Sequence, residues 1–158
     1  ISLAKNNQKI SLIKAKVKDE KLLFKWSNEK TVRMWSFNNA PIKISDHKKW
    51  FKKNIKNKRI YIWKFKYNSN FCGLVRIKLM KKNFTLSYLI TKKFRGKKLG
   101  EKMLYLTLKR LRKIKPGSKV FAKSLTKNLA SNKTLIRSGF KLFKKDFDVK
   151  TYISTVAR

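Results

Sequence analysis

The chain has 158 residues, with 44 Lys and Arg against seven Asp and Glu, and a formal net charge of +37. Hydrophobic residues make up 42%, enough for a folded core, so the chain is not a disordered basic tail. One cysteine and one histidine exclude a disulfide framework and a thiolate or His-rich metal centre, and make a Ser-His-Asp triad hard to assemble. Lysine is dispersed through every segment, which indicates a coding bias more than a selected surface. The charge still attracts phosphates and, non-specifically, nucleic acid.

The first part of the chain predicts a strand and two helices, from alternating and helical spacings of apolar residues. The expected elements, in order, are a leader over residues 1–9, a strand over Ile10–Val17, a helix capped by Asp19, a mixed stretch over Asn28–Ile44 and a helix capped by Ser45.

The remainder predicts a meander of strands and then alternating helices and strands. The expected elements are strands over Arg59–Tyr67, Phe71–Met80 and Phe84–Thr91, a long helix after Gly96 that Pro116 ends, a strand over Val120–Ala122, a helix over Asn128–Ser138, and a hairpin of Phe140–Phe143 and Val149–Ile153. The order β-α-α-β-β-β-α-β-α-β-β indicates a mixed α/β (α+β) domain.

Cellular location follows from what the chain lacks. No apolar run approaches the roughly 20 residues that span a bilayer, and no secretory signal is visible. With a single cysteine, this predicts a cytoplasmic protein with no membrane partner. We expect one domain over residues 10–158, and the first residue, Ile1, leaves open that the domain is cut from a longer protein.

A basic turn with two glycines joins the third strand of the meander to the long helix, and its residues are Arg95-Gly96-Lys97-Lys98-Leu99-Gly100. Free N–H groups at a helix N-terminus bind anions, and glycine lets a phosphate approach the backbone. The turn lacks the Gly-Lys-Ser/Thr ending of a P-loop, so ATP hydrolysis is not supported. Taken alone, the turn is explained equally well as a solvated loop in a lysine-rich chain.

A second segment carries Asn128, Ser131, Gly139 and Phe140 across the last expected helix. With the turn over 95–100, it resembles the two motifs of the GNAT acyltransferase superfamily, Arg/Gln-x-x-Gly-x-Gly/Ala and Asn-x-x-Ser-x-x-x-aromatic-x-x-x-Gly-Phe. The resemblance covers nearly the whole chain. It implies a mixed, mostly antiparallel central sheet, flanked by helices and splayed at the strand before the acetyl-CoA loop, with acetyl-CoA as co-substrate and no metal.

The resemblance also implies a cofactor site, made of Leu89, Ile90, Thr91, Arg95, Gly96, Lys97, Lys98, Leu99, Gly100, Asn128 and Ser131. Backbone groups near Leu89 and Thr91 would bind the pantetheine arm, and an N–H near Leu89 would polarise the thioester carbonyl. Two positions depart from the family pattern: Lys98 replaces a glycine, and Leu135 replaces the aromatic residue that often acts as general acid. The candidate acids are therefore Ser131, Tyr88 or water, and His47 is the candidate base.

The N-terminal half resembles, more loosely, the GNAT branch that acetylates nucleotide-linked amino sugars, whose best-known members serve the pseudaminic acid (flagellin glycosylation) pathway. The pattern is Trp-x-Asn, Val-Arg, and Ile-Ser-x-x-His-x-x-Trp-Phe. It implies a UDP-amino sugar as acceptor, with Asn28, Arg33, Trp35, His47, Trp50 and Arg76 as binding residues. From the residues alone, the helical spacing of Trp50 favours core packing over ligand stacking. Arg33 fits either a phosphate, which is slightly favoured, or an ion pair with Glu29.

Three alternatives stay open at this point. The same fold acetylates protein N-termini in the ribosomal-protein acetyltransferases, and a GNAT-like fold can have lost its activity. A basic RNA-binding module would use the charge, but the strands lack the aromatic signature of such modules. A homodimer is also left open.

Overall fold

A computed structural model describes residues 9–155, so the leader expected over residues 1–9 lies, except for Lys9, outside the described residues. The strands are β1 (Ile10–Lys14), β2 (Ile60–Tyr67), β3 (Asn70–Met80), β4 (Asn83–Ile90), β5 (Lys119–Leu125), β6 (Lys141–Asp146) and β7 (Val149–Thr155). The helices are α1 (Glu20–Ser27), α2 (Lys30–Met34), α3 (Ile44–Asn54), α4 (Leu99–Ile114) and α5 (Leu129–Arg137), with 3₁₀ turns η1 (Val17–Asp19) and η2 (Lys92–Phe94).

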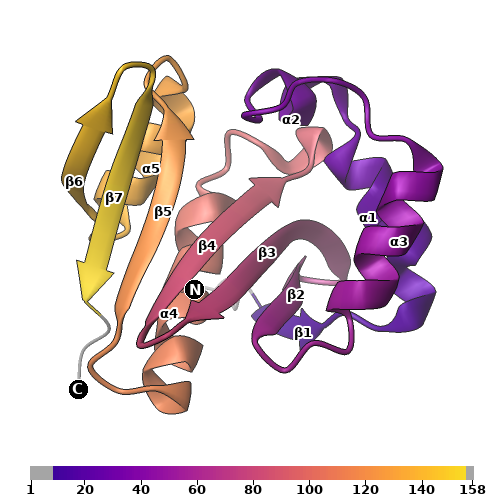
Figure 1. The fold of residues 1–158 in the computed structure, drawn as a ribbon, viewed down its shortest axis with the longest axis horizontal. Helices are drawn as coiled ribbons and strands as arrows, with labels where there is room; N and C mark the ends of the chain where they lie inside the picture. Colours follow the sequence, from indigo (N-terminus) through magenta and orange to yellow (C-terminus); the bar gives the residue numbers. More distant parts are fainter. Residues whose placement is uncertain (1–8, 156–158) are drawn as a thin grey trace, which may run out of the picture.

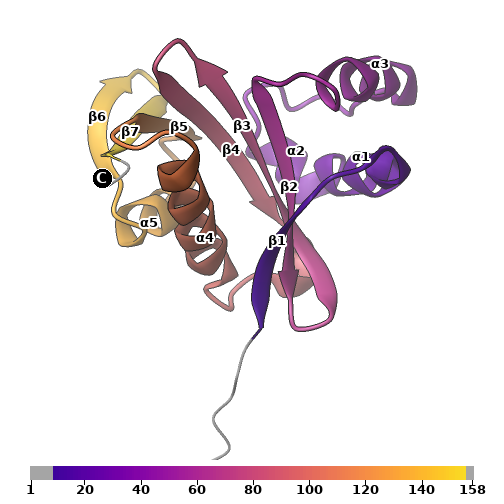
Figure 2. The same ribbon diagram turned by 90° about the horizontal axis from the view of Figure 1, so that it is seen from below.

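All seven strands form one sheet in the order β1-β2-β3-β4-β5-β7-β6. Only the β4–β5 pair is parallel, and every other pair is antiparallel. Figure 2 shows α4 and α5 on one face of the sheet and α1 and α3 on the other. The predicted fold class, a mixed and mostly antiparallel sheet flanked by helices, is confirmed.

Alternation along β3 explains why the sheet has two cores. Val75 and Ile77 are buried in a core that includes Met103 and Leu104 of α4. Leu74 lies on the opposite face, in a second core with Leu23 of α1 and Phe51 of α3. The intervening Arg76 therefore belongs to the α1–α3 face of the sheet.

The splay expected in the sheet is present between β4 and β5. These strands pair only over Phe84–Leu86 and Val120–Ala122, and beyond Leu86 they part, toward the top of Figure 1. Phe84, Leu86, Val120 and Ala122 are all buried, so packing holds the strands together at one end and leaves them free to separate at the other. The separation opens the middle of the sheet in front of α4 and α5.

Four local predictions were wrong. The first strand stops at Lys14, because the following residues turn into η1. Ser45 lies inside α3, whose N-cap is Lys43. The stretch expected to be irregular contains the short helix α2, and β5 extends past Ala122 to Leu125. Contacts with distant segments accompany three of these differences: Asp19 of η1 pairs with Lys64, Glu29 before α2 bonds Lys92, and the end of β5 pairs with β7.

Of two predicted helix caps, one is confirmed and the other is not. Asn128 caps α5 as expected, because its Oδ1 accepts a hydrogen bond from the Ser131 N–H at 3.2 Å. Asp19 stands at the N-cap of α1 but its side chain does not bond that helix. Instead its carboxylate accepts from the Lys16 N–H at 2.8 Å and pairs with Lys64 at 2.9 Å.

None of the helices within residues 9–155 is long and apolar enough to cross a membrane.

Candidate active site

The cofactor loop, residues 91–98, connects β4 to α4 through two left-handed residues. Gly96 has φ +78°, and Lys98, the N-cap of α4, has φ +57°. The left-handed region favours glycine, which gives a physical reason for the family glycine at the position of Lys98. No atom lies within 4 Å of an ideal Cβ on Gly96, so the loop leaves open space there. With the N–H groups that begin α4 and the charge of Lys97, the loop fits a diphosphate.

Gly100 has a different role from the other loop glycine. A Cβ at this position would lie 3.1 Å from Cγ2 of Thr134, on α5. Its missing side chain therefore lets α4 approach α5, which is a packing requirement. Gly73 on β3, which the sequence analysis did not single out, is tighter still, because a Cβ there would lie 2.9 Å from Ile90 Cδ1 and 3.0 Å from the Leu89 carbonyl O.

Backbone groups of β4 alternate between β3 and the splay. The Thr91 N–H donates to the Cys72 carbonyl O at 2.9 Å, and antiparallel alternation directs the backbone groups of Leu89 to β3 as well. The N–H groups of Tyr88 and Ile90 therefore face the splay, one residue away from those expected. Cofactor binding by Leu89, Ile90 and Thr91 stays a prediction.

Tyr88 and Ser131, two of the predicted catalytic residues, are brought together at the back of the splay. Tyr88 Oη lies 3.0 Å from Ser131 Oγ, at the start of α5. Burial raises the pKa of Tyr88 above its ordinary value, and hydrogen bonds with Ser131 and Thr134 oppose only part of that rise. The phenol therefore keeps its proton at neutral pH and can donate it. Leu135, at the usual position of the family acid, is fully buried in the core.

His47, the predicted base, lies in the packing between α1 and α3. The residue is 5% exposed, its Nε2 donates to the Glu20 carbonyl O at 3.0 Å, and its ring centroid is 6.0 Å from that of Phe51. The structure does not bring His47 to the Tyr88–Ser131 pair, and its role as base stays a prediction.

Arg76 is a half-buried cation on the α1–α3 face of β3. Its guanidinium lies 5.3 Å from the ring centre of Trp50, and within residues 9–155 it has no hydrogen-bond or ion-pair partner. Burial lowers the pKa of Arg76, and the positive charge of Arg33 lowers it further, although a guanidinium stays charged at neutral pH. Because an unpaired buried charge is costly, Arg76 is a strong candidate for binding an anionic ligand.

The β4 residues beside Arg76 are polar and exposed. Ser87 is the register partner of Arg76, and Thr85 lies two residues away on the same face. The sequence analysis missed both, although the alternation of Thr85 and Ser87 with Phe84 and Leu86 was the signal that could have found them. They extend the candidate site from Arg76 to the edge of the splay.

The other predicted acceptor residues build the segment around α2. Arg33 donates from Nε to the Ser27 carbonyl O at 2.8 Å and from Nη1 to the Asn38 carbonyl O at 3.0 Å, and the alternative pairing with Glu29 is absent among the described contacts. Asn28 exchanges two hydrogen bonds with the Ile42 backbone, at 2.9 and 3.2 Å. Trp35, at the end of α2, is 38% exposed.

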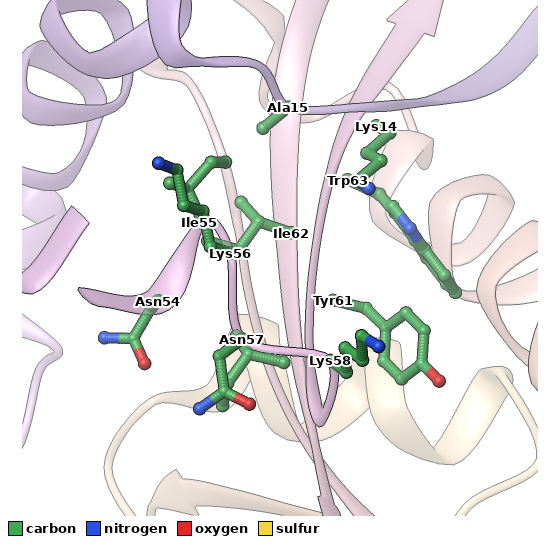
Figure 3. Close-up of a pocket in the computed structure, with 11 residues that line it drawn as sticks. Lys14, Ala15, Asn54, Ile55, Lys56, Asn57, Lys58, Tyr61, Ile62 and Trp63 are labelled. Carbon is green, nitrogen blue, oxygen red and sulfur yellow. The ribbon is translucent and has the colours of Figure 1, made fainter. Parts of the chain in front are cut away.

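A separate hollow of about 630 Å³ lies at the start of β2, away from the splay (Figure 3). Figure 3 shows Ala15, Ile55 and Ile62 on one side of it and Lys14 and Tyr61 on the other. We place the candidate site at the splay and on the adjoining surface of β3. The Tyr88–Ser131 pair lies at the splay, and Arg76, on β3, has no hydrogen-bond or ion-pair partner within residues 9–155. Among residues 9–155, no three His, Cys, Asp or Glu side chains gather as metal ligands would.

Comparisons with known proteins agree with this geometry. The model of the GNAT acetyltransferase domain family matches residues 9–141. No curated protein sequence matches the chain. A domain from Methanocaldococcus jannaschii DSM 2661 has a similar structure, with TM-score 0.84, 24% identity, and coverage of 94% of this chain and 99% of that chain.

Two further structures with a similar fold were solved with ligands bound. A spermidine N-acetyltransferase from Vibrio cholerae, in complex with CoA and spermine, has TM-score 0.82, 14% identity, and coverage of 92% of this chain and 95% of that chain. The microcin C7 self-immunity acetyltransferase MccE, in complex with acetyl-CoA and AMP, has TM-score 0.77, 18% identity, and coverage of 95% and 93%.

The family match spans well over half of the chain, and both predicted motifs lie at the expected places, before α4 and across α5. Acetyl-CoA is thereby confirmed as co-substrate, while nothing in these similarities is specific to the pseudaminic acid pathway. The chain belongs to the GNAT acetyltransferase family and is an acetyl-CoA-dependent N-acetyltransferase.

Proposed function

We propose that the enzyme acetylates the amine of a nucleotide-linked amino sugar of the UDP-4-amino-sugar type. The observation that carries this proposal is the half-buried guanidinium of Arg76, which has the Trp50 ring beside it but no hydrogen-bond or ion-pair partner within residues 9–155. An acceptor with a diphosphate supplies the missing anion, and charge-assisted contacts of Arg with phosphate are among the stronger hydrogen bonds in proteins.

Electrostatics separates this acceptor from polycationic ones. The chain has a formal net charge of +37, and the charge of Arg33 already acts on Arg76. A polyamine would add positive charge beside two guanidinium groups, whereas a nucleotide neutralises them. The similar structure MccE, in complex with acetyl-CoA and AMP, is consistent with a nucleotide in this fold.

Two tryptophans of the N-terminal half support a nucleotide as well. Trp50 lies under Arg76, and the partly exposed Trp35 follows α2. A flat ring beside a phosphate-binding cation suits a sugar face or a base, which offer apolar surface next to an anion. Backbone groups alone would suffice for an extended peptide, so the protein N-terminal alternative leaves Arg76 unexplained.

The chemistry requires little of the protein beyond positioning and proton transfer. Acetyl-CoA supplies an acetyl thioester that the amine attacks directly, so that a C–N bond forms as the C–S bond breaks. The Tyr88 phenol holds a proton at Oη, ready for the departing sulfur either directly or through Ser131 Oγ. The N–H groups of Tyr88 and Ile90 face the splay, where they can orient the acetyl carbonyl. The amine must lose a proton to attack, through water or His47.

Mass spectrometry of products tests the acceptor class. The purified protein is incubated with acetyl-CoA and, separately, with a UDP-4-amino sugar, spermidine and a basic peptide. We expect an acetyl group on the amino sugar alone, with UDP competing against the acceptor and not against acetyl-CoA. Acetylation of the peptide or of spermidine, with no binding of UDP, would replace the proposal with the corresponding alternative.

A homodimer, a cytoplasmic location and a single domain over residues 10–158 stay predictions.

A further inference from the structure

Polar contacts join the cofactor loop to α2. The Lys92 N–H donates to Glu29 Oε2 at 3.0 Å, and Arg95 Nη1 donates to Thr31 Oγ1. Arg95 Nε also donates to the Ile90 carbonyl O at 2.9 Å, at the end of β4. Arg95, which was expected to bind the cofactor, therefore links the cofactor loop to the end of β4 and to α2.

The position of Glu29 is unusual for its charge. It is one of seven acidic residues in a chain with 44 basic ones, and it contacts the loop that carries Lys97 and Lys98. A carboxylate beside a diphosphate site weakens the attraction for the diphosphate, so anion binding does not explain Glu29. The hydrogen bond from Lys92 does explain it, because the carboxylate fixes the start of the loop.

The far side of α2 leads toward the acceptor face. Arg33 bonds the Ser27 and Asn38 carbonyl oxygens and so fixes both ends of the α2 segment. Its charge also lowers the pKa of Arg76. The α2 segment thus contacts the cofactor loop through Glu29 and Thr31 and carries Arg33, one of the residues assigned to the acceptor.

We infer that Glu29 and Thr31 are positioning residues for acetyl transfer, which hold the cofactor loop against α2 so that CoA bound at the loop orders segment 29–36. This inference rests on the use of acetyl-CoA, a property of the family, and is independent of the acceptor. By linkage, the contacts that order segment 29–36 when CoA is bound strengthen CoA binding by the same free energy.

Hydrogen–deuterium exchange with CoA as the probe tests this directly. In the wild-type protein, saturating CoA should slow exchange in both the cofactor loop and segment 29–36. The double variant Glu29→Ala/Thr31→Val should keep the slowing in the loop and lose it in segment 29–36. The conservative pair Glu29→Gln and Thr31→Ser, which keep an accepting oxygen, should retain both effects.

A matched control separates contact from charge. Glu101→Ala removes an acidic residue from the first turn of α4 without touching α2, and it should leave the slowing in segment 29–36 unchanged. If Glu29→Ala weakens CoA binding about tenfold or more and Glu29→Gln does not, the positioning role is supported by that route too. Slowing of segment 29–36 that persists in the double variant, or equal effects of the Ala and Gln variants, would overturn the inference.

Discussion

Two cations lie on the α1–α3 face of neighbouring strands, and the protein treats them differently. Lys64 on β2 forms an ion pair with Asp19 at 2.9 Å, and the two side chains are 6% and 8% exposed. Arg76 on β3 has the Trp50 ring beside it and no anionic partner within residues 9–155. The fold thus neutralises one cation with an internal carboxylate, and among the described residues it supplies no carboxylate to the other, which is why we propose that a ligand does so.

The scarcity of acidic residues makes this difference informative. With seven carboxylates for 44 basic side chains, most cations must stay in solvent. A carboxylate buried beside Lys64 therefore marks a structural requirement, because an unpaired buried charge strongly destabilises a fold. Within residues 9–155 no carboxylate lies beside Arg76, which supports the proposal that this cation serves binding rather than stability.

The largest effect should come from breaking the paired site. Asp19→Ala leaves Lys64 buried without its counter-ion and should lower the free energy of unfolding by about 3–5 kcal/mol. Denaturant unfolding of the purified variant measures this. The exposed pair of Lys144 and Asp146, at 3.3 Å, is the control, and Asp146→Ala should change stability little. Equal effects at the two pairs would contradict the structural role of Asp19.

The second largest effect should come from Tyr88→Phe, which should lower the rate of catalysis and leave the stability of the fold unchanged. Removing the phenol should lower kcat by about a hundredfold, the scale of a lost general acid, with little change in the KM for acetyl-CoA. Because burial raises the pKa of Tyr88, the wild-type rate should fall only above the ordinary tyrosine pKa of 10.0. A variant with normal kcat would show that water or Ser131 supplies the proton.

Arg76→Leu should have the opposite sign of effect on stability from Asp19→Ala. Since the guanidinium is half-buried with only the Trp50 ring beside it and no counter-ion within residues 9–155, replacing it should raise the free energy of unfolding by about 1 kcal/mol. Thermal or denaturant unfolding of the ligand-free protein gives the sign. Destabilisation comparable to that of Asp19→Ala would mean that Arg76 is a structural cation like Lys64.

Cys72 extends the comparison to a buried group that carries no charge at neutral pH. Its effect on the free energy of unfolding should be the smallest of the four. Burial raises the pKa of its thiol from 9.0 to about 11, opposed in part by a backbone hydrogen bond with Tyr67. The folded state holds this proton more tightly, so its contribution is complete below pH 9.0 and is lost as the pH rises toward about 11. Unfolding free energies across this range should fall by about 1 kcal/mol per pH unit, and less in Cys72→Ala. The same slope in both proteins would contradict this assignment.

The fold was largely predictable because its signals are local. Alternation placed the three meander strands, the Asn128 cap placed the start of α5, and the two motifs indicated the splay. The end of the first strand and the helix α2 were missed, because both are fixed by contacts with distant segments. The Lys92–Glu29 bond is an example, since its partners are 63 residues apart.

The site was less predictable, because the type of a residue does not tell which way its side chain or backbone groups point. Tyr88 and Ser131 were expected and do meet, while the backbone groups facing the splay are one residue from those expected. His47 and Arg33 have polar side chains that fit a binding role, yet they bond main-chain carbonyls. Whether Arg76 forms an ion pair with a carboxylate depends on how α3 packs over β3, and the spacing of residues in the sequence does not predict that packing.

Calorimetric titration with UDP, in the presence of CoA, tests the central claim most directly. We expect wild-type protein to bind UDP, and Arg76→Gln to weaken binding about tenfold or more, which corresponds to about 1.4 kcal/mol. Lys78→Gln is the matched control, because Lys78 is an exposed cation on the same face of β3. UDP affinity that is undetectable in the wild type, or reduced equally by the two substitutions, would contradict the assignment of Arg76 to an anionic acceptor.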